Sequence, residues 1–198
     1  MEFQEVVRRR RMVRNYLDRP LPPGALDRIL ANAVRAPSAG FSQGWAFLAL
    51  EGREQTEPFW AATFAGRARD KFRWPGLFRA PAIIVPFSHR QAYLDRYAEP
   101  DKRRPAGEAA GWPVPYWDID TGFAALLMLL TAVDAGLGAL FFAVPAGRTG
   151  AVRQAFGVPD AYTPIGAVTI GHPAPDEPSS SLARGHRPLE EVVHRGRW

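Results

Sequence analysis

The chain has 198 residues, 46% of them hydrophobic, which is enough for one core and favours a single domain over residues 1–198. It contains no cysteine, so disulfides, thiolate nucleophiles, iron–sulfur clusters and cysteine-rich zinc sites are excluded. The formal net charge is +5, and only Lys71 and Lys102 of the 25 basic residues are lysines. The four histidines show no close metal-ligand spacing, so no metal site is expected.

Apolar spacing and turn residues predict the elements of the N-terminal part. Leu26, Ile29 and Leu30 form the apolar stripe of a helix, and Pro37 stops it. The run APAIIVPF has the continuous apolar character of a strand that is covered on both faces. In chain order we expect helices over residues 2–11 and 20–37, a strand over 45–50, a helix over 54–64 and a strand over 80–87.

The segment 89–117 predicts no regular structure, because prolines stand at positions 100, 105, 113 and 115. A segment of that length without regular structure is usually functional or mobile. Its aromatic side chains, which we expect to be exposed, are Tyr93, Tyr97, Trp112, Tyr116 and Trp117.

The longest apolar run covers residues 119–133. It carries Asp120 and falls short of the roughly 20 apolar residues of a membrane span. It therefore predicts a helix buried on nearly every side, at the centre of the fold or in a subunit interface. The N-terminal residues MEFQEVVRRR lack an apolar signal core, so we expect a cytoplasmic protein with no membrane partner. The C-terminal elements are expected as a helix over residues 120–135, a strand over 139–144, a helix over 148–156, a strand over 164–171 and a tail over 173–198.

These elements are most economically arranged as a mixed sheet with helices on both faces. The sequence has no GxSxG, no GxxxxGK and no complete GxGxxG motif. Gly136 and Gly138 lack the third glycine and precede a strand rather than a helix. A Rossmann-type nucleotide site therefore has no support.

Three separated features remain: the arginines of residues 10–14, the loop of small residues at 37–40, and the glycine turn with its strand at 136–143. Each has an ordinary explanation, as a solvated helix end, a tight turn, and a helix cap with a bulge. Together they fit one ligand that is flat at one end and doubly anionic at the other. A flat ring needs close approach to the backbone, and a phosphate needs arginines.

Five stretches in this order carry a family resemblance: RRRMVRNYLDRPLP, RAPSAGFSQGW, DAGLGALFFAVP, PIGAVTIGHP and RPLEEVVHRGRW. Over essentially the whole chain they resemble the FMN-dependent nitroreductase family. The resemblance implies the α+β class, a three-layer α–β–α sandwich with a mixed central sheet, and a homodimer whose partner subunit completes the site. The chain departs from the family at Met12, which replaces a serine, and at Ser42 and Gly44, which replace an asparagine and a proline.

The resemblance also implies which residues bind FMN. Arg10, Arg11 and Arg14 would hold the ribityl phosphate, with Arg187 from the tail as a further cation. The loop 37–40 would need small side chains because the isoalloxazine ring lies on its backbone. The other expected flavin contacts are Met12, Pro37, Ser38, Ala39, Gly40, Gly138, Phe141, Phe142 and Ala143.

The implied chemistry is that of the cofactor. FMN would take a hydride from NADH or NADPH and pass electrons to a flat small-molecule acceptor, such as a nitroaromatic or a quinone, by a ping-pong mechanism. No catalytic side chain is required. The lid-like segment 89–117 would choose the acceptor through Trp112, Tyr116 and Trp117, with Trp112 in contact. The alternative is a surface loop that packs on its own subunit and has no role in the chemistry.

Two other functions stay open at the level of sequence. A protein of the same fold could store or fragment its flavin, as dimethylbenzimidazole synthases do. A nucleic-acid-binding module could use the arginines of residues 8–14 with Trp112 and Trp117 as stacking platforms. The flavin-storing protein would still bind FMN, whereas the nucleic-acid-binding module would not be an enzyme. We favour the oxidoreductase and expect no nucleic-acid partner.

Overall fold

The computed structural model describes residues 1–102, 112–177 and 179–198. Residues 103–111 of the expected lid lie outside the described residues. The described residues form one sheet with the strand order β1-β2-β5-β3, in which β4 also pairs with β2. The strands are β1 (Trp45–Glu51), β2 (Ala82–Ser88), β3 (Gly138–Phe142), β4 (Thr163–Pro164) and β5 (Ala167–Gly171).

The pairs between these strands are antiparallel, with Leu48 opposite Val85 and Ala139 opposite Ile170. The parallel component of the sheet is the bridge from Met12 to Ala139, beside β3. The predicted mixed sheet of an α+β protein is thereby confirmed.

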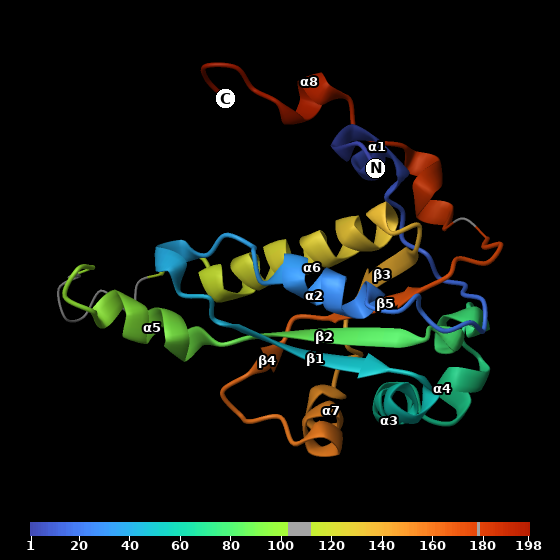
Figure 1. Cartoon of the computed structure of the whole chain (residues 1–198). Coiled ribbons are helices and arrows are strands. Elements are labelled where there is room, and N and C mark those ends of the chain that lie inside the picture. Colours follow the sequence, from blue (N-terminus) through green and yellow to red (C-terminus); the bar gives the residue numbers. More distant parts are fainter. Residues whose placement is uncertain (103–111, 178) are drawn as a thin grey trace.

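Helices cover both faces of the sheet: α2 and α6 lie on one side, and α3 and α7 lie on the other (Figure 1). The expected three-layer sandwich is therefore confirmed. The helices are α1 (Phe3–Arg9), α2 (Ala25–Ala33), α3 (Arg53–Thr63), α4 (Arg67–Asp70), α5 (Arg90–Ala98), α6 (Tyr116–Asp134), α7 (Thr149–Phe156) and α8 (Leu189–Val192), with the short 3-10 helices η1 (Ala39–Phe41), η2 (Pro75–Arg79) and η4 (Ser180–Arg184).

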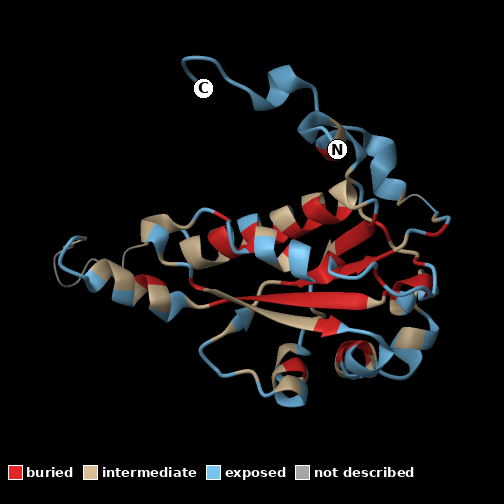
Figure 2. Ribbon diagram, in the orientation of Figure 1, coloured by how far each residue is buried: buried red, intermediate tan, exposed pale blue. Residues whose placement is uncertain are grey.

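Two hydrophobic clusters fill the spaces between the layers. Ile29 of α2 and Met128 of α6 are fully buried in the first. Phe59 and Trp60 of α3 are fully buried in the second. All seven residues of β2 are buried between the two clusters (Figure 2), because helices cover both faces of this antiparallel strand. This is why β2 reads as an unbroken apolar run in the sequence.

The apolar run of residues 119–133 forms most of α6. By length and composition α6 is the one helix of the described chain that could cross a membrane. Ala124, Met128 and Ala132, at spacings of four residues, are fully buried against α2 and the sheet. This burial identifies α6 as the central helix of the sandwich, although Phe123 and Leu126 stay exposed on its other side.

The prediction of irregular structure throughout residues 89–117 is wrong in two places. The helix α5 begins at Arg90, directly after β2, and α6 begins at Tyr116 rather than at residue 120. α5 carries one buried residue, Tyr93. It therefore lacks the apolar stripe by which a helix is recognised in a sequence. The expectation that the aromatic side chains of this segment are exposed is wrong, because Tyr93 is buried and Tyr97, Trp112, Tyr116 and Trp117 are partly buried.

The segment after α1 is bound to the sheet. The amide of Val13 donates to the carbonyl of Ala139 at 2.9 Å. The hydroxyl of the fully buried Tyr16 donates to the carbonyl of Val13 at 2.9 Å and lies 2.9 Å from the hydroxyl of Thr169. These contacts hold the arginine-rich segment along β3. A Cβ added at Gly138 would lie 2.8 Å from a methyl group of Val13, so the glycine allows this close approach.

We predict that Gly138→Ala lowers the free energy of unfolding by about 1–3 kcal/mol, because the added methyl group overpacks Val13. The matched control is Gly150→Ala in α7, where no atom lies within 4 Å of the added Cβ. The control should stay within about 1 kcal/mol of wild type. Urea unfolding of both variants without added ligand measures the difference, and equal stabilities would contradict the steric role of Gly138.

Candidate functional site

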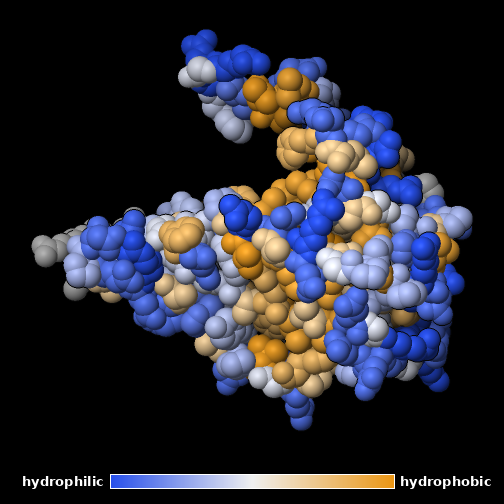
Figure 3. Space-filling view, viewed as in Figure 1, coloured by the Kyte–Doolittle hydropathy of each residue, from blue (hydrophilic) through white to orange (hydrophobic). Residues whose placement is uncertain are grey.

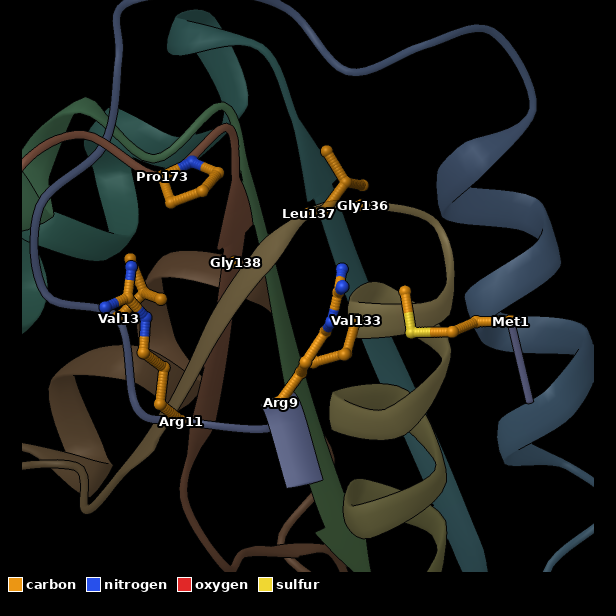
Figure 4. Close-up of a pocket in the computed structure, with 9 residues that line it drawn as sticks. All are labelled: Met1, Arg9, Arg11, Val13, Val133, Gly136, Leu137, Gly138 and Pro173. Atoms are coloured by element: carbon orange, nitrogen blue, oxygen red, sulfur yellow. The ribbon is translucent and has the colours of Figure 1, made fainter. Parts of the chain in front are cut away.

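A pocket of about 310 Å³ joins two of the three features found in the sequence (Figure 4). Arg9 extends toward the turn at Gly136 and Leu137, and Arg11 lies beside Val13. The structure thus places the arginine-rich segment against the glycine turn. The lining residues are Met1, Arg9, Arg11, Val13, Val133, Gly136, Leu137, Gly138 and Pro173.

The arginines at this pocket differ in their partners. Glu5 accepts hydrogen bonds from Arg8, at 2.7 and 2.8 Å, and from Arg9. The bond from Arg8, followed by that from Arg9, lowers the pKa of Glu5 to about 2. Glu5 therefore stays ionised at neutral pH and offsets part of the charge of its two partners. Arg10 and Arg11 form no ion pair within the described residues, so they are the cations left for an anionic ligand.

Arg14 belongs to a second, aromatic pocket of about 160 Å³. Its guanidinium lies 5.1 Å from the ring centroid of Trp74 and donates to the carbonyl of Met12 at 3.2 Å. Its backbone amide donates to Asp176 at 2.8 Å. The site residues Arg14, Phe141 and Phe142 are thus brought together. The full lining is Arg14, Phe72, Trp74, Leu77, Leu140, Phe141 and Phe142.

Trp74 was not predicted as a site residue. Arg73 also lies over its ring, with the guanidinium 4.9 Å from the ring centroid, so two cations contact Trp74. The indole Nε1 of Trp74 is buried and has no hydrogen-bond partner among the described residues. The Trp74 ring and the two guanidinium groups give the pocket a flat aromatic wall with positive charge beside it, which suits a flat anionic ligand. The sequence signal for this role is the interleaving of basic and aromatic residues in KFRWPGLF.

The other residues predicted to contact the flavin lie in different surroundings. Met12 is tied to the sheet by its bridge to Ala139. Phe142 stacks on Trp60 with ring centroids 6.0 Å apart, so its ring is part of the second hydrophobic cluster. Ala143 is exposed just after β3. Arg187 is exposed in the tail and bonds to Glu191 at 3.2 Å; it does not line either pocket.

The loop of small residues is a strained turn. Gly40, Phe41 and Gln43 all have positive φ, at 62°, 56° and 48°. Positive φ is uncommon for residues other than glycine and clusters at ligand sites. The Ser38 hydroxyl accepts a hydrogen bond from the Gln43 amide at 3.0 Å, and the neighbouring Pro37 is exposed.

The ring of Tyr97 from α5 packs closely on this loop. A Cβ added at Gly40 would lie 2.7 Å from the Tyr97 ring. Trp112 packs on Tyr97 at 4.7 Å between ring centroids, and on Tyr116 and Trp117 at 5.3 and 6.4 Å. The three expected lid residues therefore form an aromatic cluster with α5, next to the loop of small residues.

The two groups of predicted residues lie at opposite ends of α6. Asp120, near its N-terminal end, accepts a hydrogen bond from the backbone amide of Ala39 in the small-residue loop at 2.7 Å. Val133, in its last turn, lines the arginine pocket. Thirteen residues of helix span about 20 Å. One chain therefore does not bring the small-residue loop to the arginines.

The described fold and pockets define a three-layer α+β protein with an arginine-flanked aromatic site. Residues 7–172 match the model of the Nitroreductase family, which is most of the chain. The chain belongs to the Nitroreductase family.

Individual relatives agree with this assignment. A Methanothermobacter thermautotrophicus protein, assigned as an NADH dehydrogenase/NAD(P)H nitroreductase, is 37% identical over 57 residues; the match spans 29% of this chain and only 30% of that relative. A nitroreductase family protein from Clostridium difficile 630 has a TM-score of 0.71 at 23% identity, with 100% of both chains covered. A Desulfovibrio desulfuricans protein, assigned as a nitroreductase and solved in complex with FMN, has a TM-score of 0.71 at 23% identity, with 100% of this chain and 98% of that chain covered. At these identities the structural likeness shows the fold.

Proposed function

We propose that the protein is an FMN-dependent oxidoreductase that takes electrons from NADH or NADPH and reduces a flat acceptor such as a nitroaromatic or a quinone. The observation that carries the proposal is the aromatic pocket lined by Arg14 and Trp74, next to a segment whose Arg10 and Arg11 form no ion pair among the described residues. Membership of the Nitroreductase family supports it. So do the FMN complex of the Desulfovibrio protein and the NAD(P)H named for the Methanothermobacter relative.

The residues present fit FMN. Arg10 and Arg11 would supply positive charge for the phosphate at the end of α1, and Arg14, three residues after Arg11, would add a third cation. Guanidinium groups bind phosphate through two parallel hydrogen bonds, which makes arginine suited to this task. The aromatic pocket lined by Trp74, Phe141 and Phe142 would hold the flat ring.

FMN supplies the redox chemistry when it is bound, by taking up two electrons from the nicotinamide and releasing them to the acceptor. The protein binds and orients the reactants and excludes water. No side chain has to act as an acid or base, and donor and acceptor use the same pocket in turn. Trp112, Tyr116 and Trp117 are proposed to face the acceptor, and this lid role stays a prediction, as do the single-domain organisation and the cytoplasmic location.

The direct test is the colour of the purified protein. We expect it to be yellow, to bleach under anaerobic conditions with NADH or NADPH, and to regain its colour when a quinone is added. A yellow protein that neither nucleotide bleaches would favour the flavin-storing alternative. A colourless protein that takes up no FMN but binds single-stranded DNA would favour the nucleic-acid-binding module.

The phosphate assignment predicts a difference between arginines. Arg14→Ala and Arg10→Ala should each raise the dissociation constant of FMN about 10- to 100-fold, the effect of losing one charge-assisted hydrogen bond. Arg19→Ala should leave it within about twofold, because Arg19 lines a separate pocket. Fluorescence titration measures these constants. Riboflavin lacks the phosphate and serves as the control: a comparable loss of riboflavin affinity in the Arg10 and Arg14 variants would remove the assignment.

We also propose a homodimer. Ile119, Phe123 and Leu126 form an exposed apolar stripe on α6, with exposed fractions of 37%, 43% and 46%. Every residue from 180 to 198 is exposed, including Trp198 at 99%, and this tail projects beyond the sandwich (Figure 1). Apolar surface runs down the middle of the molecule beneath the tail, and the tail carries an apolar patch of its own (Figure 3). Surfaces of this kind are characteristic of subunit interfaces.

A twofold axis across α6 would also complete the site. Antiparallel packing of two α6 helices sets the first turn of one helix beside the last turn of the other. The small-residue loop 37–40 of one chain would then meet the arginine pocket of its partner. The dimer would therefore bring together the loop and the arginines, which lie about 20 Å apart within one chain.

The wild-type protein is therefore expected to be a dimer at micromolar concentration by light scattering. Leu126→Arg should yield monomers and abolish FMN retention, because a charge in an apolar interface is unfavourable and each site needs both chains. Ala155→Arg is the control, since Ala155 is exposed on α7, on the opposite side of the sheet. A wild-type monomer that retains FMN would contradict the shared site.

A further inference from the structure

The strained loop is held from two sides by side chains that the proposed function leaves without a role. Phe41 and Gln43 keep positive φ although neither is glycine, and Phe41 is 73% exposed. Such a conformation persists only where surrounding contacts determine it. Since Phe41 is mostly in solvent, its own packing does not hold it. The backbone amide of Gln43 closes the turn by donating to Ser38, and two further restraints act on the neighbouring Ala39 and Gly40.

Asp120 supplies the first restraint. Its side chain is 3% exposed, and its Oδ2 accepts hydrogen bonds from the Ala39 amide at 2.7 Å and from the Tyr93 hydroxyl at 2.8 Å. Burial, followed by the bond to Asp120, raises the pKa of Tyr93, so this hydroxyl keeps its proton and donates. Within the described residues no cation pairs with Asp120. Burying a carboxylate without a cation is costly, which points to a role beyond stability.

Arg96 supplies the second restraint. Its Nε donates to the carbonyl of Gly40 at 2.9 Å, while its terminal nitrogens bind Asp101 at 2.7 and 2.8 Å. Tyr93, Arg96 and Tyr97 all belong to α5. The loop is therefore fixed to α5 as well as to α6, and α5 is the helix on which the aromatic cluster of Trp112 packs.

We propose that Asp120 is a positioning residue that joins the small-residue loop to α5, acting through Ala39 and Tyr93, and thereby sets how the acceptor meets the flavin ring. The inference rests on the proposed function, in which this loop lies against the flavin. It adds a residue whose side chain touches neither the phosphate arginines nor the aromatic pocket with Trp74. Disturbing Asp120 moves the loop and the aromatic cluster together.

The test compares Asp120→Asn and Tyr93→Phe with Asp118→Asn. Asp120→Asn keeps an acceptor oxygen but removes the negative charge that strengthens both hydrogen bonds to Oδ2, and Tyr93→Phe removes one donor without adding charge. Asp118 is the matched control, because it lies two residues earlier on α6 but accepts its bond from Ser88 of β2, at 2.6 Å. For each variant we would measure amide hydrogen exchange of a peptide spanning residues 37–43, FMN affinity, and the kcat and KM of a quinone with NADPH.

Both test variants should raise loop exchange and lower kcat/KM for the quinone about tenfold, the ratio expected from one buried hydrogen bond. Their FMN dissociation constants should stay within about threefold, because neither substitution removes an arginine or a residue that lines the aromatic pocket. Asp118→Asn should match wild type in all three readouts. Equal effects of Asp118→Asn and Asp120→Asn, or faster loop exchange with unchanged quinone kinetics, would overturn the proposal.

Tyr93→Phe decides the question if Asp120→Asn does not fold. A wild-type protein without FMN binding or NADPH turnover would defeat the proposed function instead. Hydrogen exchange of the loop still tests the positioning contact in that case, and unchanged exchange in both test variants would overturn it separately.

Discussion

α6 lies flat against the sheet through Ala124, Met128 and Ala132, and this contact determines what one chain can assemble. A helix fixed along its length acts as a rigid spacer, so the groups at its two ends keep a constant separation. Asp120 and the strained loop belong to one end, and Val133 with the arginine pocket belongs to the other. The same helix is exposed and apolar on its outer side. It therefore separates the loop from the arginines within one chain, and it offers the surface through which a dimer would bring them together.

Local signals explain why most of the sandwich could be predicted from the sequence. β2 and α6 are continuous apolar runs because they are covered by other layers, and the strand or helix follows from the run itself. α5 was missed because Tyr93 alone is buried on it. Tyr97 and Val13 of the same chain pack closely on Gly40 and Gly138, and these contacts were not predicted. Such contacts join residues far apart in the sequence, and no spacing encodes them.

The candidate site was predictable only in part, for a related reason. The arginine-rich segment and the glycine turn at Gly136 were identified separately, and the structure brings them together in one pocket. Trp74 was not identified, because its role depends on contacts with the guanidinium groups of Arg14 and Arg73. Arg73 is its neighbour in the sequence, but Arg14 is not. Glu5 likewise binds Arg8 and Arg9, so these two arginines are less available to an anionic ligand than Arg10 and Arg11. The run of four arginines in the sequence does not show this difference.

The division of the site between the two ends of α6 has a genetic consequence for the proposed dimer. A chain defective at Arg10 retains a sound loop end, and a chain defective at Asp120 retains a sound arginine end. Mixed dimers of these two chains would contain one site built from both sound ends and one site carrying both defects. Two alleles that are each impaired alone would then complement one another when expressed together, restoring up to half of the sites in every mixed dimer.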